Sequence, residues 1–342
     1  MIALTTGSQV RADQVIYKGA SHPAVTIVGF ERGMLIFDGL DGVSHTVPIS
    51  DVDMIIVDRA GMFTDFNQAE RLLARGEAEH AITRYRRTLR LSEAFWSDLI
   101  AARLLVACDR AGRIDQATLG FIRLASGSYA GPEAAAMLIP QNIPSDRTPK
   151  ALRAIDHLDA AIAEASHPNQ SAPLAMLRYK IMSTSGDGRA AAAARTVTAM
   201  KIPSGQQSEA MYAIQLDALR RRAANKLDAA DRAGLERAIR DCPDRLLPDF
   251  LLLKGRTLAR GASTQADLIR ASWPFMHIVA HAPQDARAAE GLYETALLLE
   301  RLGQREKAAQ LLDECLAHKR VDPRTQRLAK ERRARLKESY AS

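Results

Sequence analysis

Two histidines in the C-terminal third of the chain, His277 and His281, have the spacing of a metal-binding pair. Residues four apart on a helix lie on one face, so both imidazoles could contact a single ion. A zinc site needs at least a third protein ligand, and the residues between the histidines are isoleucine, valine and alanine. We therefore expect the two side chains to flank the buried position of Ile278, and we predict no metal and no cofactor.

Two other patterns fall short of a catalytic or ion-binding motif. Residues 127–131 have the glycine spacing of a nucleophile elbow, but Tyr129 stands where that motif requires serine. Four aspartates near the N-terminus occupy turn positions and lack the spacing of a calcium loop; they are Asp38, Asp41, Asp51 and Asp53. The sequence therefore predicts a protein that is not an enzyme.

The three cysteines are widely spaced and include no C-x-x-C pair. Cys108 and Cys315 fall on the apolar faces of predicted helices, whereas Cys242 precedes a proline. We expect the cysteines to act as small buried hydrophobic residues, and we predict neither disulfides nor metal ligands among them.

The formal net charge of +7 is concentrated at the C-terminus. Residues 319–342 contain nine Lys or Arg and three acidic residues, so the rest of the chain is close to neutral. Such a tail could bind a nucleic acid or another anionic partner. It could instead cap the open end of a helical array, with Leu328 and Leu336 packed on the helix that carries Leu312 and Cys315. We favour the cap.

Residues 1–58 contain short β-rich runs separated by Gly, Asp and Pro turns. These runs are Val10, Val15 and Tyr17; Val25, Ile27 and Val28; Leu35 and Phe37; Val47 and Ile49; and Ile55 to Val57. A unit of about five strands resembles the SH3-like and Sm-like small barrels in its pattern. We predict a small β-barrel domain over residues 1–60. It should pack close to the first helices, because the joint at residues 59–61 is short.

From Phe63 onward the apolar period changes from two to 3.6 residues, which indicates helices. Residues 65–125 and 249–318 show pairs of amphipathic helices. Pro274 predicts a kink or a late start in the helix that contains it. Between these pairs the pattern is weaker, and the predicted helices cover residues 132–138, 148–165, 171–185, 188–200, 207–224 and 228–241.

Small residues recur in these pairs where two antiparallel helices must approach closely. Ala81 and Ala117 occupy such positions in the first two pairs, and Ala296 and Ala308 do so in the last. The pattern resembles the tetratricopeptide repeat, a helix–turn–helix unit that stacks into a solenoid and binds other proteins. The resemblance implies a mostly α-helical fold, with an α-solenoid of TPR-like helix pairs over residues 61–342 after the small five-stranded β-barrel.

In the tetratricopeptide family, peptides bind to one face of the first helix of each repeat. Carried over position by position, that face holds Phe63, Phe66, Glu70, Leu73, Ala74, Leu99, Ala102, Val106, Asp109, Arg110, Glu290, Tyr293, Leu297, Glu300 and Arg301. The resemblance implies a partner-binding groove formed by Asp109, Arg110, Tyr293, Glu300 and Arg301. Phe66 and Glu70 stand where chaperone-binding members carry their carboxylate-clamping Lys and Asn, which disfavours that role.

These features predict a non-catalytic scaffold or adaptor that binds a protein or peptide partner. The alternative is a nucleic-acid-associated protein that uses the barrel or the basic tail, although the balanced charge of the barrel disfavours phosphate binding. No run of about 18 apolar residues occurs, so we expect no membrane-spanning helix. The N-terminus does not resemble a signal peptide, so we expect a cytoplasmic protein, or a periplasmic one if a leader was removed.

Overall fold

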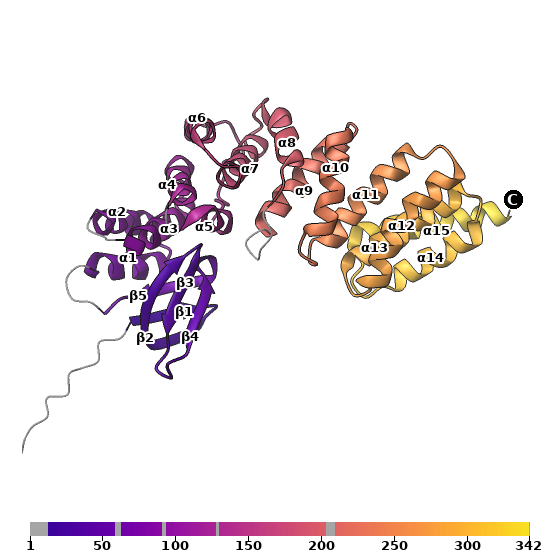
Figure 1. The fold of residues 1–342 in the computed structure, drawn as a ribbon. Helices are drawn as coiled ribbons and strands as arrows, with labels where there is room; N and C mark the ends of the chain where they lie inside the picture. The colour runs from indigo at the N-terminus through magenta and orange to yellow at the C-terminus, as the bar shows by residue number, and fades with distance from the viewer. Residues whose placement is uncertain (1–12, 59–62, 91–93, 128–129, 203–208, 342) are drawn as a thin grey trace, which may run out of the picture. The chain divides into compact units, whose positions relative to one another are not determined.

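The computed structural model describes residues 13–58, 63–90, 94–127, 130–202 and 209–341. The chain divides into two compact units, an N-terminal unit of residues 1–193 and a C-terminal unit of residues 194–342. The N-terminal unit combines a five-stranded sheet with helices, and the described part of the C-terminal unit is built from helices (Figure 1). The prediction of a mostly helical protein with an N-terminal unit of five strands is confirmed.

The sheet is antiparallel, with the strand order β4-β3-β2-β1-β5. Its strands are β1 (Asp13–Tyr17), β2 (Ala20–Glu31), β3 (Met34–Asp38), β4 (Ser44–Pro48) and β5 (Val52–Ile56). They match the predicted runs, with Val10 outside the described residues. Lys18-Gly19 and Arg32-Gly33 form the first two turns, and both residues of each turn have positive φ. This geometry is typical of two-residue hairpin loops, whose twist matches that of the strands.

The sheet does not close into the predicted barrel, because the described strands β4 and β5 do not pair with each other. Side chains from the helices occupy the outer edge of β5 instead. The N–H groups of Ile55 and Val57 donate to Glu70 and Asn67, at 2.9 and 2.8 Å. Carbonyl groups at the start of β5 accept from Arg103. Since these backbone groups already have partners, the edge is not open to a further strand.

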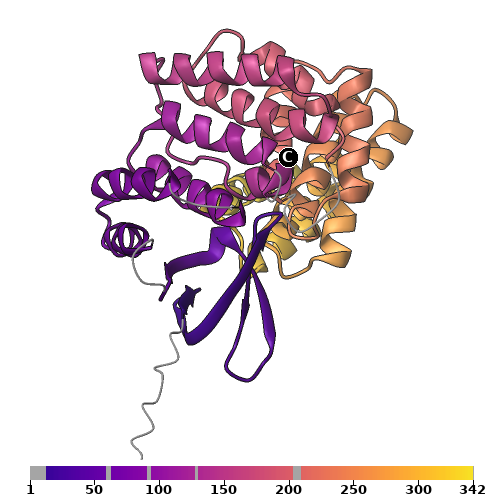
Figure 2. The same ribbon diagram turned by 60° about the vertical axis from the view of Figure 1, so that its left-hand side comes forward.

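The N-terminal unit stacks consecutive helices on one side of the sheet, as the purple and pink helices of Figure 2 show. These helices are α1 (Thr64–Ala74), α2 (Ala78–Leu89), α3 (Ala94–Arg110), α4 (Ile114–Ser126), α5 (Gly131–Met137), α6 (Pro149–Glu164) and α7 (Pro168–Thr184). The short 3-10 helix η1 (Ile49–Asp51) contacts α5, while β5 contacts α1 and β2 contacts α3. The β-unit therefore packs against the first helices, as predicted.

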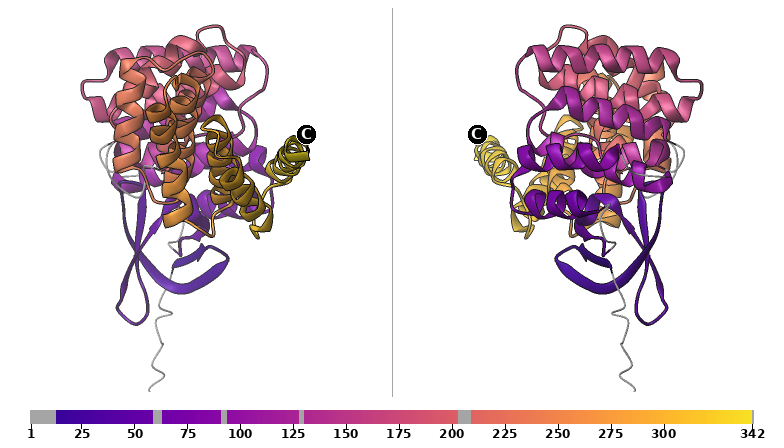
Figure 3. Two further views of the ribbon diagram at one scale, coloured as in Figure 1. Left: turned by 90° about the vertical axis from the view of Figure 1, so that its right-hand side faces the viewer. Right: turned by 90° about the vertical axis from the view of Figure 1, so that its left-hand side faces the viewer.

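The helix α8 (Ala190–Ala199) crosses the boundary between the two units. The C-terminal unit continues with α9 (Glu209–Ala223), α10 (Ala229–Asp241), α11 (Leu247–Gly261), α12 (Gln265–His281), α13 (Ala286–Arg301), α14 (Arg305–Ala317) and α15 (Pro323–Ala341). From α11 onward each helix contacts the next one in the chain (Figure 3). The predicted helices of the middle region are confirmed within a few residues at each end. Their assignment to tetratricopeptide repeats in one continuous solenoid stays a prediction.

Buried small residues hold the helix pairs close together. Ala81, Ala117, Ala296 and Ala308 have no exposed surface, which confirms their predicted positions at helix contacts. Gly255 of α11 faces Phe275 of α12, and a Cβ atom at Gly255 would lie 2.4 Å from the ring. A side chain at position 255 would therefore force the Phe275 ring to shift. Pro274 lies inside α12, which begins at Gln265 after the capping residue Thr264, so this helix does not start late.

Replacing Ala308 with leucine tests the packing of the last helices. Ala308 lies in the core cluster that α13, α14 and α15 share with Leu312 and Leu336. The larger side chain should overpack this contact and lower the free energy of unfolding by about 1–3 kcal/mol. Urea unfolding measures the effect, with Gln310→Leu at an exposed site of the same helix as the control. Equal stability of the two variants would show that the α13–α14 contact is not close-packed.

Candidate partner-binding site

A fully buried ion pair joins the sheet to the helices of the N-terminal unit. Glu70 of α1 and Arg103 of α3 are 0% and 1% exposed. The guanidinium of Arg103 donates to the carboxylate of Glu70 through Nε at 2.7 Å and Nη2 at 2.8 Å. It also donates to the carbonyl oxygens of Val52 and Asp53 in β5, at 2.8 and 3.0 Å. One arginine therefore holds two helices and a strand together.

The carboxylate of Glu70 is satisfied on both of its oxygens. In addition to Arg103, it accepts the N–H of Ile55 at 2.9 Å and the hydroxyl of Tyr85 at 2.5 Å. Burial, followed by the charge of Glu70, raises the pKa of Tyr85 well above its usual value. Burial alone would lower the pKa of Arg103, but the nearby Glu70 and Tyr85 outweigh it and raise that pKa. Both pKa shifts keep Tyr85 protonated and Arg103 charged near neutral pH, which fits a structural role.

Two further side chains bind backbone groups of the sheet at its ends. Asn67 donates to the carbonyl of Val57 and accepts its N–H, both at 2.8 Å. Asp13 accepts the N–H groups of Ile27 and Asp58, at 3.0 and 2.9 Å. Asn67, Glu70 and Arg103 thus bind the outer edge of β5, where a closed barrel would pair a further strand, whereas Asp13 binds within the sheet.

The predicted peptide-binding face of the first helix pairs lies where the sheet packs against α1 and α3. Glu70 is on that face, and its α1 neighbours Phe63, Phe66 and Leu73 are buried. The corresponding α3 residues Leu99 and Ala102 are buried as well. The face that binds peptides in tetratricopeptide proteins is therefore part of the hydrophobic core in this stretch of the chain.

Asp109 and Arg110, two of the predicted groove residues, lie together at the end of α3. The carboxylate of Asp109 accepts the N–H groups of Gln141 and Asn142, at about 3 Å, and so anchors the segment that follows α5. Arg110 is exposed and reaches the carbonyl of Leu73 at 3.4 Å. Asp109 thus supports the fold, and Arg110 is exposed to solvent.

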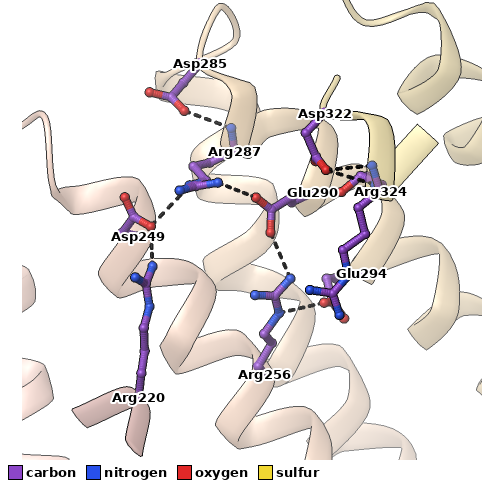
Figure 4. A network of polar contacts seen from close by, with 10 residues as sticks. Arg220, Asp249, Arg256, Asp285, Arg287, Glu290, Glu294, Asp322 and Arg324 are labelled. Carbon is purple, nitrogen blue, oxygen red and sulfur yellow. Dashed lines mark hydrogen bonds and ion pairs between the residues drawn. The ribbon is translucent and has the colours of Figure 1, made fainter. Parts of the chain in front are cut away.

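A ladder of alternating charges runs across α9, α11 and α13 in the C-terminal unit, as Figure 4 shows. Asp249 accepts from Arg220 and from Arg287, the latter at 3.1 Å. Glu290 accepts from Arg287 at 2.6 Å and from Arg256 at 2.9 Å. Arg256 also contacts Glu294 of α13, at 2.7 Å. Burial alone would lower the pKa of Arg256, but the carboxylates of Glu294 and Glu290 outweigh it and raise that pKa.

The other three predicted groove residues, Tyr293, Glu300 and Arg301, all belong to α13. Tyr293 is half-buried against the core of the last helices, and burial raises its pKa. Glu300 accepts from Arg332 of α15 at 2.5 Å. Arg301 donates to two carbonyl groups at the C-terminal end of α11, both at 2.9 Å. Each of the three contacts a neighbouring helix of its own unit.

The basic tail forms α15 and packs on the preceding helices. Ala329 and Leu336 are buried in the cluster that contains Leu312 and Cys315, so the predicted contact of Leu336 is confirmed. Leu328 is only half-buried, because the buried face of α15 follows the spacing of Thr325, Ala329 and Leu336. Two tail arginines bind acidic residues of the preceding helices: Arg332 contacts Glu300, and Arg333 contacts Asp313 at 2.9 Å.

His277 and His281 stack edge to face, with ring centroids 4.4 Å apart, and both are exposed on α12. Ile278 between them is buried, as predicted. Within the described ranges, no group of three or more His, Cys, Asp or Glu side chains is arranged to hold a metal ion. No helix in the described part of the chain is both long enough and apolar enough to cross a membrane.

The cysteines fit the expected role of small hydrophobic side chains. Cys108 and Cys315 are buried, and Cys242 is half-buried. Burial raises the pKa of each thiol to about 11, so the reactive thiolate form is scarce near neutral pH.

An exposed apolar stripe runs along α12. Ile269, Trp273 and Met276 are 48%, 67% and 38% exposed. Their spacing of four and then three residues places them on one face of the helix. The opposite face carries Leu268, Ala271, Phe275 and Ile278, which form the core of the α11–α12 pair. The repeat pattern in the sequence predicts only this buried face, although the residues of the second apolar face follow the same helical spacing.

A groove of about 580 Å³ opens beside Trp273, between α10, α11 and α12. Its walls include the apolar side chains of Ile239, Leu251, Leu258 and Pro274, with His277 at one end. Lys254 of α11 and Glu236 of α10 also line the groove and form an ion pair with a distance of 2.8 Å. An exposed tryptophan at the rim of an apolar groove is the type of arrangement that proteins use to bind partners.

Comparison with known protein families finds no family model that matches this chain. Comparison with curated proteins likewise finds no match. The tetratricopeptide resemblance thus depends on the residues of the chain itself, and the site must be judged from its geometry.

Replacing Arg103 with methionine tests the buried ion pair. The substitution leaves the carboxylate of Glu70 buried without its counter-ion, so we expect the free energy of unfolding to fall by roughly 3–5 kcal/mol. Trp96 of α3 reports the unfolding of this unit by fluorescence, in a Trp273→Phe background. The control is Arg84→Met, which removes a partly exposed pair with Asp65 and should cost less than about 1 kcal/mol. Similar losses in both variants would contradict the central role of Arg103.

Deleting residues 322–342 tests the cap. The deletion removes Ala329 and Leu336 and exposes the apolar surface around Leu312, so the melting temperature should fall by several degrees. As a control, glutamine replaces the exposed cations Arg327, Lys330, Arg335 and Lys337, which removes charge but keeps the packing. This control should melt like the wild type. An unchanged melting temperature after deletion, together with loss of tight binding to a random oligonucleotide, would identify the tail as a nucleic-acid ligand.

Proposed function

We propose that this protein is a non-catalytic scaffold that binds another protein through its TPR-like helices. The observation that carries the proposal is the apolar stripe of α12, where Trp273 has two thirds of its surface exposed. An indole buries about 150–250 Å² on binding, and tryptophan is enriched among the residues that dominate binding energy. Exposure of such a group costs solubility, and a partner that covers it removes this cost.

Other surfaces of the chain are less available to a partner than the stripe on α12. The first-helix face of the N-terminal repeats is buried beneath the sheet. The ladder across α9, α11 and α13 already pairs its carboxylates with arginines. A partner at the ladder would have to compete with these ion pairs. Of the groove residues inferred from the family, Arg110 of the N-terminal unit and Arg301 of the C-terminal unit are exposed.

Nucleic-acid binding is the weaker proposal. Arg332 and Arg333 of the tail bind acidic residues of the same unit, so their charge is partly neutralised. Arg103, the most buried cation among the described residues of the N-terminal unit, has its hydrogen bonds directed to Glu70 and β5. These contacts favour a stabilising role for both sets of arginines.

Affinity capture with a Trp273→Asp variant tests the proposed function. A charge at the centre of the stripe should remove partners that the wild-type protein retains, by a loss of about tenfold or more. The control is Leu119→Asp, which places the same charge at another exposed apolar residue, on α4. Quantitative mass spectrometry compares the proteins retained by each variant. Identical retention by the wild type and Trp273→Asp would refute a role for the stripe.

A further inference from the structure

A second depression, of about 480 Å³, lies where α9 and α11 end and α10 and α12 begin. Its described lining is strongly cationic, with four positive side chains and one carboxylate: Lys226, Arg232, Arg260, Arg270 and Asp267. The remaining lining residues are apolar or neutral, with Leu227 and Leu258 among them. A concave surface with this excess of one charge concentrates ligands of the opposite charge.

Intramolecular contacts leave much of this positive charge uncompensated. Asp267 accepts from Arg270 at 2.8 Å and also from the capping residue Thr264. Arg260 donates to the carbonyl of Ala223 at 2.5 Å, which orients its guanidinium without neutralising it. Lys226 and Arg232 are exposed. The depression can therefore accept at least one further anionic group.

This cationic depression adjoins the apolar groove at Trp273. Leu258 and Arg270 line both cavities. Along α12 the lining runs from Asp267 to His277, a rise of about 15 Å at 1.5 Å per residue. An extended peptide covers that distance with about five residues at about 3.3 Å each. The combined surface is cationic at one end and apolar at the other.

We propose that this combined groove binds an acidic segment of a partner protein. Carboxylates of the segment contact Lys226, Arg232 and Arg270, and a bulky apolar side chain about four or five residues away packs on Trp273. The proposal rests on the proposed scaffold function and adds the chemistry of the partner.

A protein segment fits this groove better than a nucleic acid does. In the apolar part, the charges of Glu236 and Lys254 are paired with each other, so this pair offers little attraction to a phosphate backbone. Trp273 is the single Trp, Tyr or Phe side chain in the described lining, whereas single-stranded nucleic acids stack successive bases on several rings. The aliphatic walls formed by Ile239, Leu251 and Pro274 suit an aliphatic or phenyl side chain.

Fluorescence of Trp273 provides a direct test. The chain has two tryptophans, and a Trp96→Phe variant leaves Trp273 as the reporter. The probes are synthetic peptides with three acidic residues followed by a spacer of two, three or four serines and a terminal Leu-Phe. We expect a saturable blue shift for at least one spacer, because the indole leaves water. We also expect affinity to weaken several-fold as the salt concentration rises to about 0.5 M.

Charge reversal at the cationic end provides the control. Lys226→Glu combined with Arg232→Glu should weaken binding by about tenfold or more, whereas Lys307→Glu, at an exposed site on α14, should change it by less than about twofold. Circular dichroism of each variant establishes that its helices are intact. If the double reversal unfolds the chain, Arg232→Gln alone should still weaken binding.

Three outcomes would overturn the proposal: no blue shift with any acidic peptide, equal binding of peptides with lysine in place of the acids, or tighter binding of a random RNA oligonucleotide. Should the peptides fail while capture still depends on Trp273, the scaffold function stands and only the acidic partner is wrong. If capture is also unchanged in Trp273→Asp, both proposals fail.

Discussion

The ion pair between Glu70 and Arg103 is the contact on which the N-terminal unit depends. It is removed from solvent, so its charges are stable only while each keeps its partner and the backbone groups of β5. The two side chains form hydrogen bonds with backbone groups at the outer edge of β5, which would otherwise need another strand as their partner. The Glu70–Arg103 pair thus explains why the sheet stays open and why it is attached to α1 and α3. It also explains why the first-helix face is buried.

The C-terminal unit uses its charges in a different way. Arg256 contacts two carboxylates of the neighbouring helix α13, whereas Arg287 contacts Asp249 of α11 and Glu290 of its own helix, and these contacts are only partly buried. They fix the spacing of α11 and α13 while they neutralise the surface. The exposed apolar surface and the excess positive charge lie elsewhere, along α12 and at the ends of α9 and α11. This separation explains why we place partner binding on α12.

Local patterns predicted the elements of this fold well. The runs around Val25 and Leu35 became strands, and the 3.6-residue period predicted even the helices of the weak middle region. The prediction of a closed barrel was wrong. Glu70 and Arg103 bind the edge of β5 and leave the sheet open, and no local sequence period encodes their contact. The tetratricopeptide resemblance places Glu70 on the peptide-binding face, whereas its carboxylate is buried. Trp273 was overlooked because the repeat register accounts for one face of α12 only.

Hydrogen–deuterium exchange with a captured partner bound tests the central claim most directly, since it maps the covered surface without any substitution. We predict slower exchange in peptides from residues 223–281, which contain the groove of α10 to α12, and unchanged exchange in α1, α3 and the sheet. Protection confined to α13–α15, or to the sheet and α1–α3, would contradict the account, because it would place the partner on surfaces where ion pairs and burial already satisfy the side chains.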